Sequence, residues 1–312
     1  MSKLLVVFGA TGNQGSSVIR HVLASPYLSK EYRIRAITRD SSSHQAKQLT
    51  ALQVDVVSGD VNDSDNLFQI LSGAHTVFGM TTTNYAGPHG HDEVQQGRNI
   101  VDAAIQAEAQ YLVWSTLPSP TAISSGKYTK VTSFDAKAQV EEYIRTKPIR
   151  NSFLAPGSFM QNFATVMKPL PSPSKDGSYV IARPVAPSAK LPLLDIGGDT
   201  GAFVAALLTD PVKFEGKTIC GASALYTMEE QAELISQATG KLVRYQQVPE
   251  DIYRSYLPPD STDELTEMLL YQEEFGYYGA DTEKLVKESV NDAIGEPVSF
   301  QRFLQQNPLS LE

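Results

Sequence analysis

The sequence predicts an α/β fold, a Rossmann-type doubly wound parallel sheet with a smaller C-terminal α/β lobe. Three observations predict it. An apolar run, Leu4–Phe8, leads into a glycine-rich turn; short apolar segments alternate with helical patterns through the first half of the chain; and this rhythm ends near Pro156. Such alternation is typical of parallel sheets with helices on both faces. We therefore expect residues 1–156 to form the sheet domain and residues 157–312 the smaller lobe, with the chain free to cross back between them.

The individual elements follow from apolar patterning. After the first strand, further strands are expected at Arg33–Thr38, Val54–Ser58, Thr76–Met80, Tyr111–Ser115 and Ser152–Ala155. Apolar residues at helical spacing predict helices between these strands, one of them from Ser133 to Arg145, and later at Thr200–Leu208, Met228–Thr239 and Asp263–Glu274. In parallel sheets ligands bind beyond the carboxyl ends of the strands. The residues after each strand therefore hold most of the functional information.

Composition places the chain among globular proteins. It has 312 residues, 41% hydrophobic and 20% charged, and no run approaching the about 20 apolar residues of a membrane span. Cys220, the single cysteine, excludes internal disulfides and suits a reducing compartment, so we expect a cytoplasmic protein, with nuclear entry left open. With a net charge of −9 and no block of Lys or Arg, neither direct nucleic-acid binding nor a membrane partner is expected.

The glycine turn is the most informative motif. Its candidate binding residues are Gly9, Thr11, Gly12, Asn13, Gln14 and Gly15. In a strand–turn–helix context the first glycine permits a tight turn, the second a close approach to phosphates and the third helix–strand packing. The helix N-terminus then offers free N–H groups to an anion. The spacing GxxGxxG is not the commonest fingerprint, and an ordinary glycine-rich turn is the alternative, but the context predicts dinucleotide binding.

The end of the second strand bears on which dinucleotide binds. Arg39 offers a guanidinium to the 2′-phosphate of NADP, whereas Asp40 would bond the ribose hydroxyl of NAD if it turned inward. Because Arg39 comes first, we expect NADP(H) to be preferred over NAD(H). The alternative is that Arg39 is an ordinary solvated side chain.

Two further strand ends fit the same pocket. Asp60 and Val61 follow the third strand, where a carboxylate and backbone groups hold adenine; Thr81, Thr82 and Thr83 follow the fourth, where small hydroxyl side chains line ribose and pyrophosphate. Turns and helix caps favour the same residue types, so a purely local role is the alternative for each group.

Lys137 is the candidate catalytic residue. It lies among Phe134, Val140 and Ile144 on one helical stripe, where a buried lysine needs a partner. A nicotinamide ribose would supply one; the alternative is a surface pair with Glu141, four residues on, although Lys before Glu is the weaker order.

The position four residues before this lysine departs from the common dehydrogenase pattern. Tyr-x-x-x-Lys would place a tyrosine where the chain has Ser133, and a serine hydroxyl needs a separate base to do proton-transfer work. Tyr128 and Tyr143 are nearby in sequence but lack the helical spacing. The usual proton donor is therefore missing.

With these motifs in order, the chain resembles the NmrA-like family, atypical short-chain dehydrogenases related to isoflavone reductase-like proteins. The resemblance covers nearly the whole length and rests on GATGNQG at Gly9–Gly15, Thr38-Arg39, Gly59–Val61, Gln96–Asn99, Tyr111–Thr116, Phe134–Arg145, Pro156–Asn162 and Asp195–Gly197. It implies NAD(P) binding by the glycine turn, Arg39, the Thr81–Thr83 loop, Lys137 and, near the nicotinamide, Phe159, Met160, Gln161 and Asn162. It also implies a second, smaller domain after Pro156.

The resemblance leaves two functions open. Some members of the family resemble redox sensors that modulate a protein partner, such as a GATA-type transcription regulator; others resemble NADPH-dependent reductases of flat carbonyl or quinone substrates. The missing tyrosine favours the sensor, with oxidoreductase activity as the alternative. A cationic Lys137 beside the nicotinamide would disfavour the oxidised, positively charged ring, so we expect unequal affinities whose difference shrinks in Lys137→Ala.

Three other groups have weaker signals. The aromatics Tyr271, Phe275, Tyr277 and Tyr278 would wall a flat substrate if they faced the cleft, with plain packing as the alternative. His89 and His91 lack partners at metal-ligand spacing, so no metal is expected and a loop is favoured. Asp92 and Glu93 are expected to begin the next helix, and Cys220 to lie in the core.

Overall fold

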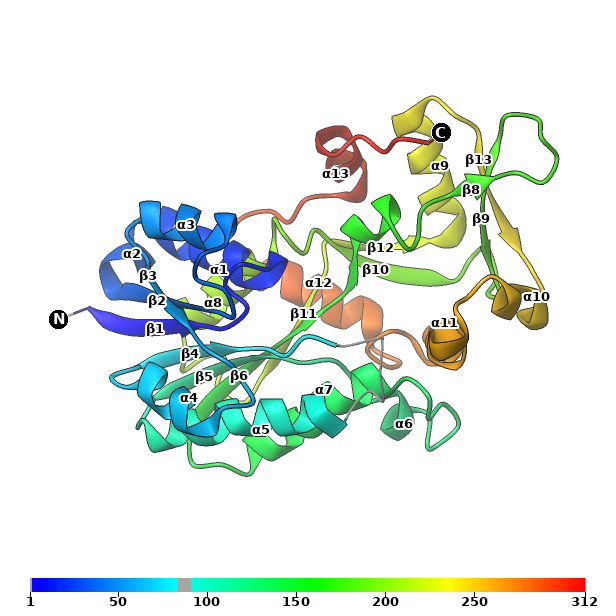
Figure 1. The fold of residues 1–312 in the computed structure, drawn as a ribbon. Coiled ribbons are helices and arrows are strands. Elements are labelled where there is room, and N and C mark those ends of the chain that lie inside the picture. Colours follow the sequence, from blue (N-terminus) through cyan, green and yellow to red (C-terminus); the bar gives the residue numbers. More distant parts are fainter. Residues whose placement is uncertain (1, 84–90, 312) are drawn as a thin grey trace.

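The computed structural model describes residues 2–83 and 91–311, and it confirms the predicted fold class. At its centre is a seven-stranded sheet in the order β11-β6-β5-β4-β1-β2-β3 (Figure 1). Every neighbouring pair is parallel. The strands are β1 (Lys3–Val7), β2 (Tyr32–Thr38), β3 (Asp55–Ser58), β4 (Thr76–Gly79), β5 (Tyr111–Ser115), β6 (Arg150–Pro156) and β11 (Thr218–Gly221).

Helices cover both faces of this sheet because its strands are apolar on both sides. On β1, Leu5 and Val7 enter one core cluster, while Leu4 and Val6 enter the other. The first face is covered by α1 (Asn13–Ala24), α2 (Leu28–Glu31), α3 (His44–Ala51) and α8 (Thr200–Thr209). The second is covered by α4 (Ser64–Leu71), α5 (His91–Gln106) and α7 (Thr132–Arg145), with the short α6 (Pro120–Ile123) before α7 (Figure 1). Burial on both faces explains the near-continuous apolar runs.

Residues after 156 also contribute to the large sheet. Helix α8 packs on α1, and β11 pairs with β6, which places Ile219 beside Leu154. Ser17 Oγ of α1 donates to the carbonyl of Gly198 at 2.9 Å, just before α8. The chain thus crosses from the C-terminal lobe back to the sheet, and α8 packs beside α1 at Ser17.

The C-terminal lobe is built from two small sheets and five helices. Its sheets are ordered β12-β10-β7 and β13-β9-β8. The strands are β7 (Ser158–Phe159), β8 (Leu170–Pro171), β9 (Tyr179–Arg183), β10 (Lys190–Leu194), β12 (Ala224–Thr227) and β13 (Val243–Gln247). The helices are α9 (Met228–Thr239), α10 (Glu250–Ser255), α11 (Thr262–Phe275), α12 (Thr282–Asp292) and α13 (Phe300–Gln306), with 3-10 turns at Met160–Ala164 and Pro259–Ser261. Met160, Phe163 and Phe300 lie in its core.

Most predicted elements match the structure to within two residues. Tyr111–Ser115 and Met228–Thr239 have the predicted bounds, and Cys220 is buried in β11 as expected. The Pro- and Ser-rich stretch between Lys168 and Pro192 contains strands that the sequence did not predict, because β8 and β9 are short and partly exposed and so lack strong alternation.

Within residues 2–83 and 91–311, no helix is both long and apolar enough to span a membrane. Over the same residues, no three His, Cys, Asp or Glu side chains are grouped as a metal ion would require. His91 begins α5, and His89 lies outside the described residues.

Candidate functional site

The ends of the central strands meet at one edge of the sheet. Thr11, in the turn after β1, lies 3.3 Å from Thr38 of β2, measured between the Oγ1 atoms. Gly59, after β3, donates its N–H to the carbonyl of Thr38 at 3.0 Å. Ser115 at the end of β5 donates to Oε1 of Gln14 at 2.8 Å. The turns that follow β1 and β3 therefore meet at Thr38, the last residue of β2, as the parallel arrangement requires.

The glycine turn has the geometry of a phosphate cradle. Gly9 has φ +61°, a left-handed conformation that favours glycine. A Cβ on Gly15 would come within 2.4 Å of the Gly9 carbonyl oxygen, so helix α1 approaches the turn more closely than any other residue type allows. Gly12 caps α1 without a side-chain hydrogen bond, and the first turn of α1 contains no acidic residue. The first N–H groups of the helix are therefore available to an anion.

Arg39 and Asp40, at the end of β2, are both exposed but differ in their contacts. Asp40 Oδ1 accepts from the backbone N–H of Ser42 at 2.8 Å and from its hydroxyl at 2.6 Å. The Ser42 hydroxyl holds the pKa of the Asp40 carboxyl below its usual value. Within residues 2–83 and 91–311, nothing bonds the Arg39 guanidinium. Asp40 is thus held in a local turn, whereas Arg39 is free to bind a phosphate.

The loop after β3 is tied to α5. Asp60 Oδ1 accepts from the backbone N–H and the side-chain amide of Asn62, both at 2.9 Å. The Asn99 amide donates to the carbonyl of Val61 at 3.0 Å, and the Gln96 amide donates to Asn62 Oδ1 at 3.2 Å. Asp60 therefore closes a turn that α5 steadies, which is compatible with an adenine site formed by the turn's backbone.

Lys137 is buried, as its position on the apolar stripe predicts, and its partner is Glu93 of α5. The ammonium donates to Glu93 Oε1 and, at 3.2 Å, to Thr83 Oγ1. Thr81 donates to the same Glu93 oxygen at 2.6 Å. The Lys137 and Glu93 side chains are 10% and 6% exposed. The alternative pairing with Glu141 is wrong, because Glu141 bonds Arg145 instead.

Close packing of α5 on α7 makes this pairing possible. A Cβ on Gly97 would lie 2.5 Å from Cγ2 of Val140 and 2.8 Å from its Cγ1. Glu93 is one turn before Gly97 on α5, and Lys137 is one turn before Val140 on α7. The two charged side chains therefore meet just beyond the point where the helix axes come nearest.

Neither of the tyrosines nearest to Lys137 in the described sequence, Tyr128 and Tyr143, bonds it within residues 2–83 and 91–311. The Tyr128 hydroxyl donates to Glu274 at 2.8 Å; burial first, and then this carboxylate, raise the pKa of Tyr128. The Tyr143 hydroxyl bonds Asp102 at 2.7 Å on the exposed side of α5. Ser133 is buried, and within the described part of the chain its hydroxyl has no hydrogen-bond partner.

The segment after β6 lies next to the glycine turn. Gln161 donates to Asp195 at 2.6 Å and accepts from the N–H of Ile196 at 3.2 Å, so its amide is engaged in holding the loop after β10. Phe159 and Asn162 are half-buried, while the Met160 side chain is fully buried in the C-terminal core. A ligand here would meet the side chains of Phe159 and Asn162 and the backbone of Met160.

The C-terminal aromatics pack against the protein. Tyr271, Tyr277 and Tyr278 are buried; the Tyr278 hydroxyl donates to the carbonyl of Ala155 at 3.0 Å and that of Tyr277 to the carbonyl of Pro156 at 3.2 Å. Plain packing, the alternative interpretation of this group, therefore describes them better than a substrate wall.

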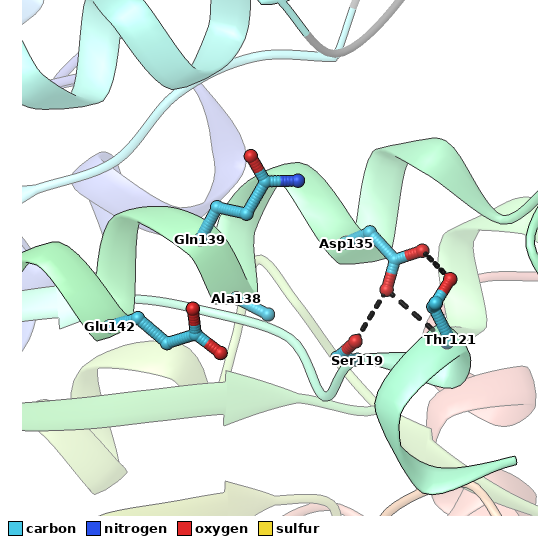
Figure 2. A pocket seen from close by; sticks show the side chains of 6 residues that line it. All are labelled: Ser119, Thr121, Asp135, Ala138, Gln139 and Glu142. Carbon is cyan, nitrogen blue, oxygen red and sulfur yellow. Dashed lines mark hydrogen bonds between the residues drawn. The ribbon is translucent and has the colours of Figure 1, made fainter. Parts of the chain in front are cut away.

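A small open pocket lies on another face of α7 (Figure 2). It is lined by Ser119, Thr121, Asp135, Ala138, Gln139 and Glu142. Asp135 accepts from the hydroxyls of Ser119 at 2.6 Å and Thr121 at 2.5 Å, as the dashed lines in Figure 2 show. Asp135, Ala138, Gln139 and Glu142 share one side of the helix and Lys137 lies on the other, so this pocket is separate from the strand-end site.

Sequence reasoning missed two residues of the site. Glu93 was expected only to begin a helix, which it does, but it also neutralises Lys137. The signal was the buried lysine itself, which requires an acidic partner. Ser115 was seen only as part of a strand, although its position at the strand's carboxyl end marked it as a candidate.

Comparisons with known proteins agree with this architecture. The model of the NmrA-like family matches residues 1–304. An NmrA-like family domain-containing protein of Dictyostelium discoideum is 28% identical over 316 residues, covering 98% of both chains. The NmrA-like family domain-containing oxidoreductase lnaB of Aspergillus flavus is 29% identical over 258 residues, covering 79% of this chain and 76% of its own. Among solved structures, NmrA, a negative transcriptional regulator in complexes with NAD and with NADP, superposes with a TM-score of 0.81 at 24% identity, covering 98% of this chain and 95% of NmrA.

Proposed function

The chain belongs to the NmrA-like family, and from this membership and the strand-end geometry we propose that it binds NADP(H) and acts as a redox-sensing regulator of a protein partner. The observation that carries the binding is the open N-terminus of α1 behind the Gly9 turn, together with the Arg39 guanidinium at the neighbouring strand end, which has no bond to residues 2–83 or 91–311. The N-terminus of α1 suits a diphosphate, and the Arg39 guanidinium suits a 2′-phosphate. The NAD and NADP complexes of NmrA support the same class of ligand.

The regulatory role rests on the proton chemistry of the site. Ser133 stands where a dehydrogenase has its tyrosine, and Tyr128 and Tyr143 bond carboxylates elsewhere. Lys137 is held by Glu93. A site that binds the nucleotide without a tyrosine proton donor among residues 2–83 and 91–311 is suited to reporting which nucleotide is present. The partner would be a protein such as a transcription regulator, because the chain is acidic and NmrA is a negative transcriptional regulator.

Calorimetry tests the binding. NADP and NADPH should bind with measurable heat, and NAD and NADH more weakly. Absence of heat with all four would overturn the proposal. Hydrogen exchange then tests the sensor: the oxidised and reduced nucleotides should protect the loops around Gln161 and Asp195 to different extents, because a ligand can shift a conformation only by binding its states unequally. Equal affinities together with identical protection would refute sensing.

The second candidate is an NADPH-dependent reductase of quinones, enones or other carbonyl compounds. One observation favours it: Thr81, Glu93, Lys137 and Thr83 form a continuous hydrogen-bonded set at the strand-end edge, through which a proton can pass. NADPH, when bound, would supply the hydride. The oxidoreductase lnaB is a relative that supports this class.

Loss of the NADPH absorbance band separates the two candidates. With a panel of quinones, enones and aldehydes, the regulator predicts tight binding and no consumption. Steady consumption that is lost in Lys137→Ala but kept in the surface variant Glu142→Gln would establish the reductase instead.

A further inference from the structure

The Lys137–Glu93 pair is a complete, buried charge pair at the edge where the nicotinamide end of a dinucleotide would lie. Among residues 2–83 and 91–311, Glu93 Oε1 accepts from Thr81 and from Lys137, and Lys137 also donates to Thr83. Both side chains are at most 10% exposed. Because so little water reaches these groups, their charges are weakly screened.

We propose that Glu93 determines how the site discriminates between oxidised and reduced nucleotide, by neutralising the charge of Lys137. The inference rests on the proposed binding of NADP(H). Oxidised nicotinamide is positively charged and reduced nicotinamide is neutral. An isolated lysine would repel the oxidised ring but not the reduced one. An ion pair has no net charge, and its electric field falls off much faster with distance. Glu93 thus removes the penalty that Lys137 would otherwise impose on the oxidised form.

This assignment changes the expected effect of Lys137 substitutions on the relative affinities for oxidised and reduced nucleotide, which was derived for Lys137 without a partner. Removing the lysine while leaving Glu93 exposes an uncompensated carboxylate, so the oxidised form should gain affinity relative to the reduced form. Removing the carboxylate while leaving the lysine should do the opposite. Removing both should restore the original balance, because the net charge is again zero.

The test measures the ratio of the dissociation constants of NADP and NADPH by calorimetry, because structural losses common to both nucleotides cancel in a ratio. Glu93→Gln should raise this ratio about tenfold and Lys137→Met should lower it about tenfold, the scale of one weakly screened unit charge at close range. The double variant E93Q/K137M should stay within about twofold of the wild type. Glu141→Gln removes the same charge from α7, the helix that carries Lys137, at a site paired with Arg145; it is the matched control and should leave the ratio unchanged.

The outcomes distinguish failure of the inferred role of Glu93 from failure of the proposed NADP(H) binding. If the wild type binds neither nucleotide, the proposed function fails. If nucleotides bind but Glu93→Gln and Lys137→Met weaken both forms equally, the inference is overturned and the proposed function stands. Thermal melting of each variant shows whether it folds. Should Glu93→Gln fail to fold, Lys137→Met and the double variant still decide the matter, because equal ratios in those two would refute a role for Glu93.

Discussion

Gly97→Ala tests the helix contact that brings Glu93 to Lys137. The new Cβ would lie 2.5 and 2.8 Å from the two γ-carbons of Val140, which is fully buried. Carbon atoms in contact prefer about 3.5–4.0 Å, so the helices must separate by about 1 Å. Overpacking of this kind costs about 1–3 kcal/mol, while alanine is favoured over glycine inside a helix by about 1 kcal/mol. We expect a net loss of up to about 2 kcal/mol in the free energy of unfolding.

A double-mutant cycle with Val140→Ala isolates the contact. Val140→Ala deletes both clashing γ-carbons and leaves only its Cβ, 3.2 Å from the new atom, so most of the overpacking is relieved in its background. Gly97→Ala should there stabilise the protein by up to about 1 kcal/mol, which gives a coupling of about 1–3 kcal/mol between the two positions.

Urea denaturation of the four proteins, followed by circular dichroism, measures the cycle. A loss of the same size in both backgrounds would show that the close approach of α5 to α7 does not limit this position. The argument that this approach places Glu93 beside Lys137 would then fail.

Three further predictions follow from single sites. Arg39→Ala should weaken NADP(H) binding about tenfold or more while leaving NAD(H) unchanged, because only the 2′-phosphate is lost as a partner; calorimetry showing equal losses for both would contradict this. Burial raises the pKa of Asp199 in the folded protein to about 6, from an ordinary value of 3.8. The stability contributed by the protonated carboxyl is therefore fully present below pH 3.8 and is lost as the pH rises through about 6. Asp199→Asn, whose amide oxygen still accepts from the N–H of Val298, should therefore gain about 2 kcal/mol over the wild type between about pH 4 and about pH 7 in urea denaturation, and a pH-independent difference would refute it. Thr227→Ala removes one side of the capping box shared with Glu230 at the start of α9 and should cost about 1 kcal/mol by the same assay, whereas an unchanged midpoint would show the cap to be dispensable.

Local pattern was enough to predict the elements and the edge at which they meet. The apolar run before Gly9, the helical stripe around Lys137 and the bounds of β5 depend on residues near one another in the chain, and the structure confirms each of them. Parallel alternation then implied that the residues after successive strands lie together, and Thr11 and Thr38 do.

The partners of those residues were beyond the sequence. The sequence offered two candidate partners for Lys137, the neighbouring Glu141 and a nicotinamide ribose, and the structure pairs it with Glu93, 44 positions away. Likewise, the order of residues favoured Arg39 over Asp40, but only the structure showed that the Ser42 turn engages the carboxylate.

The amino-acid sequence by itself determined the α/β class, the glycine turn, the burial of Lys137 and the absence of a tyrosine at Ser133. Tertiary structure decided the return of β11 to the sheet, the packing of Tyr278 under Ala155 and the neutralisation of Lys137. The physical reason is the separation along the chain of the residues that interact. Periodicity and turn chemistry depend on neighbours along the chain, whereas the pairing of charges depends on how closely two helices approach, and here a missing Cβ at Gly97 permits that approach.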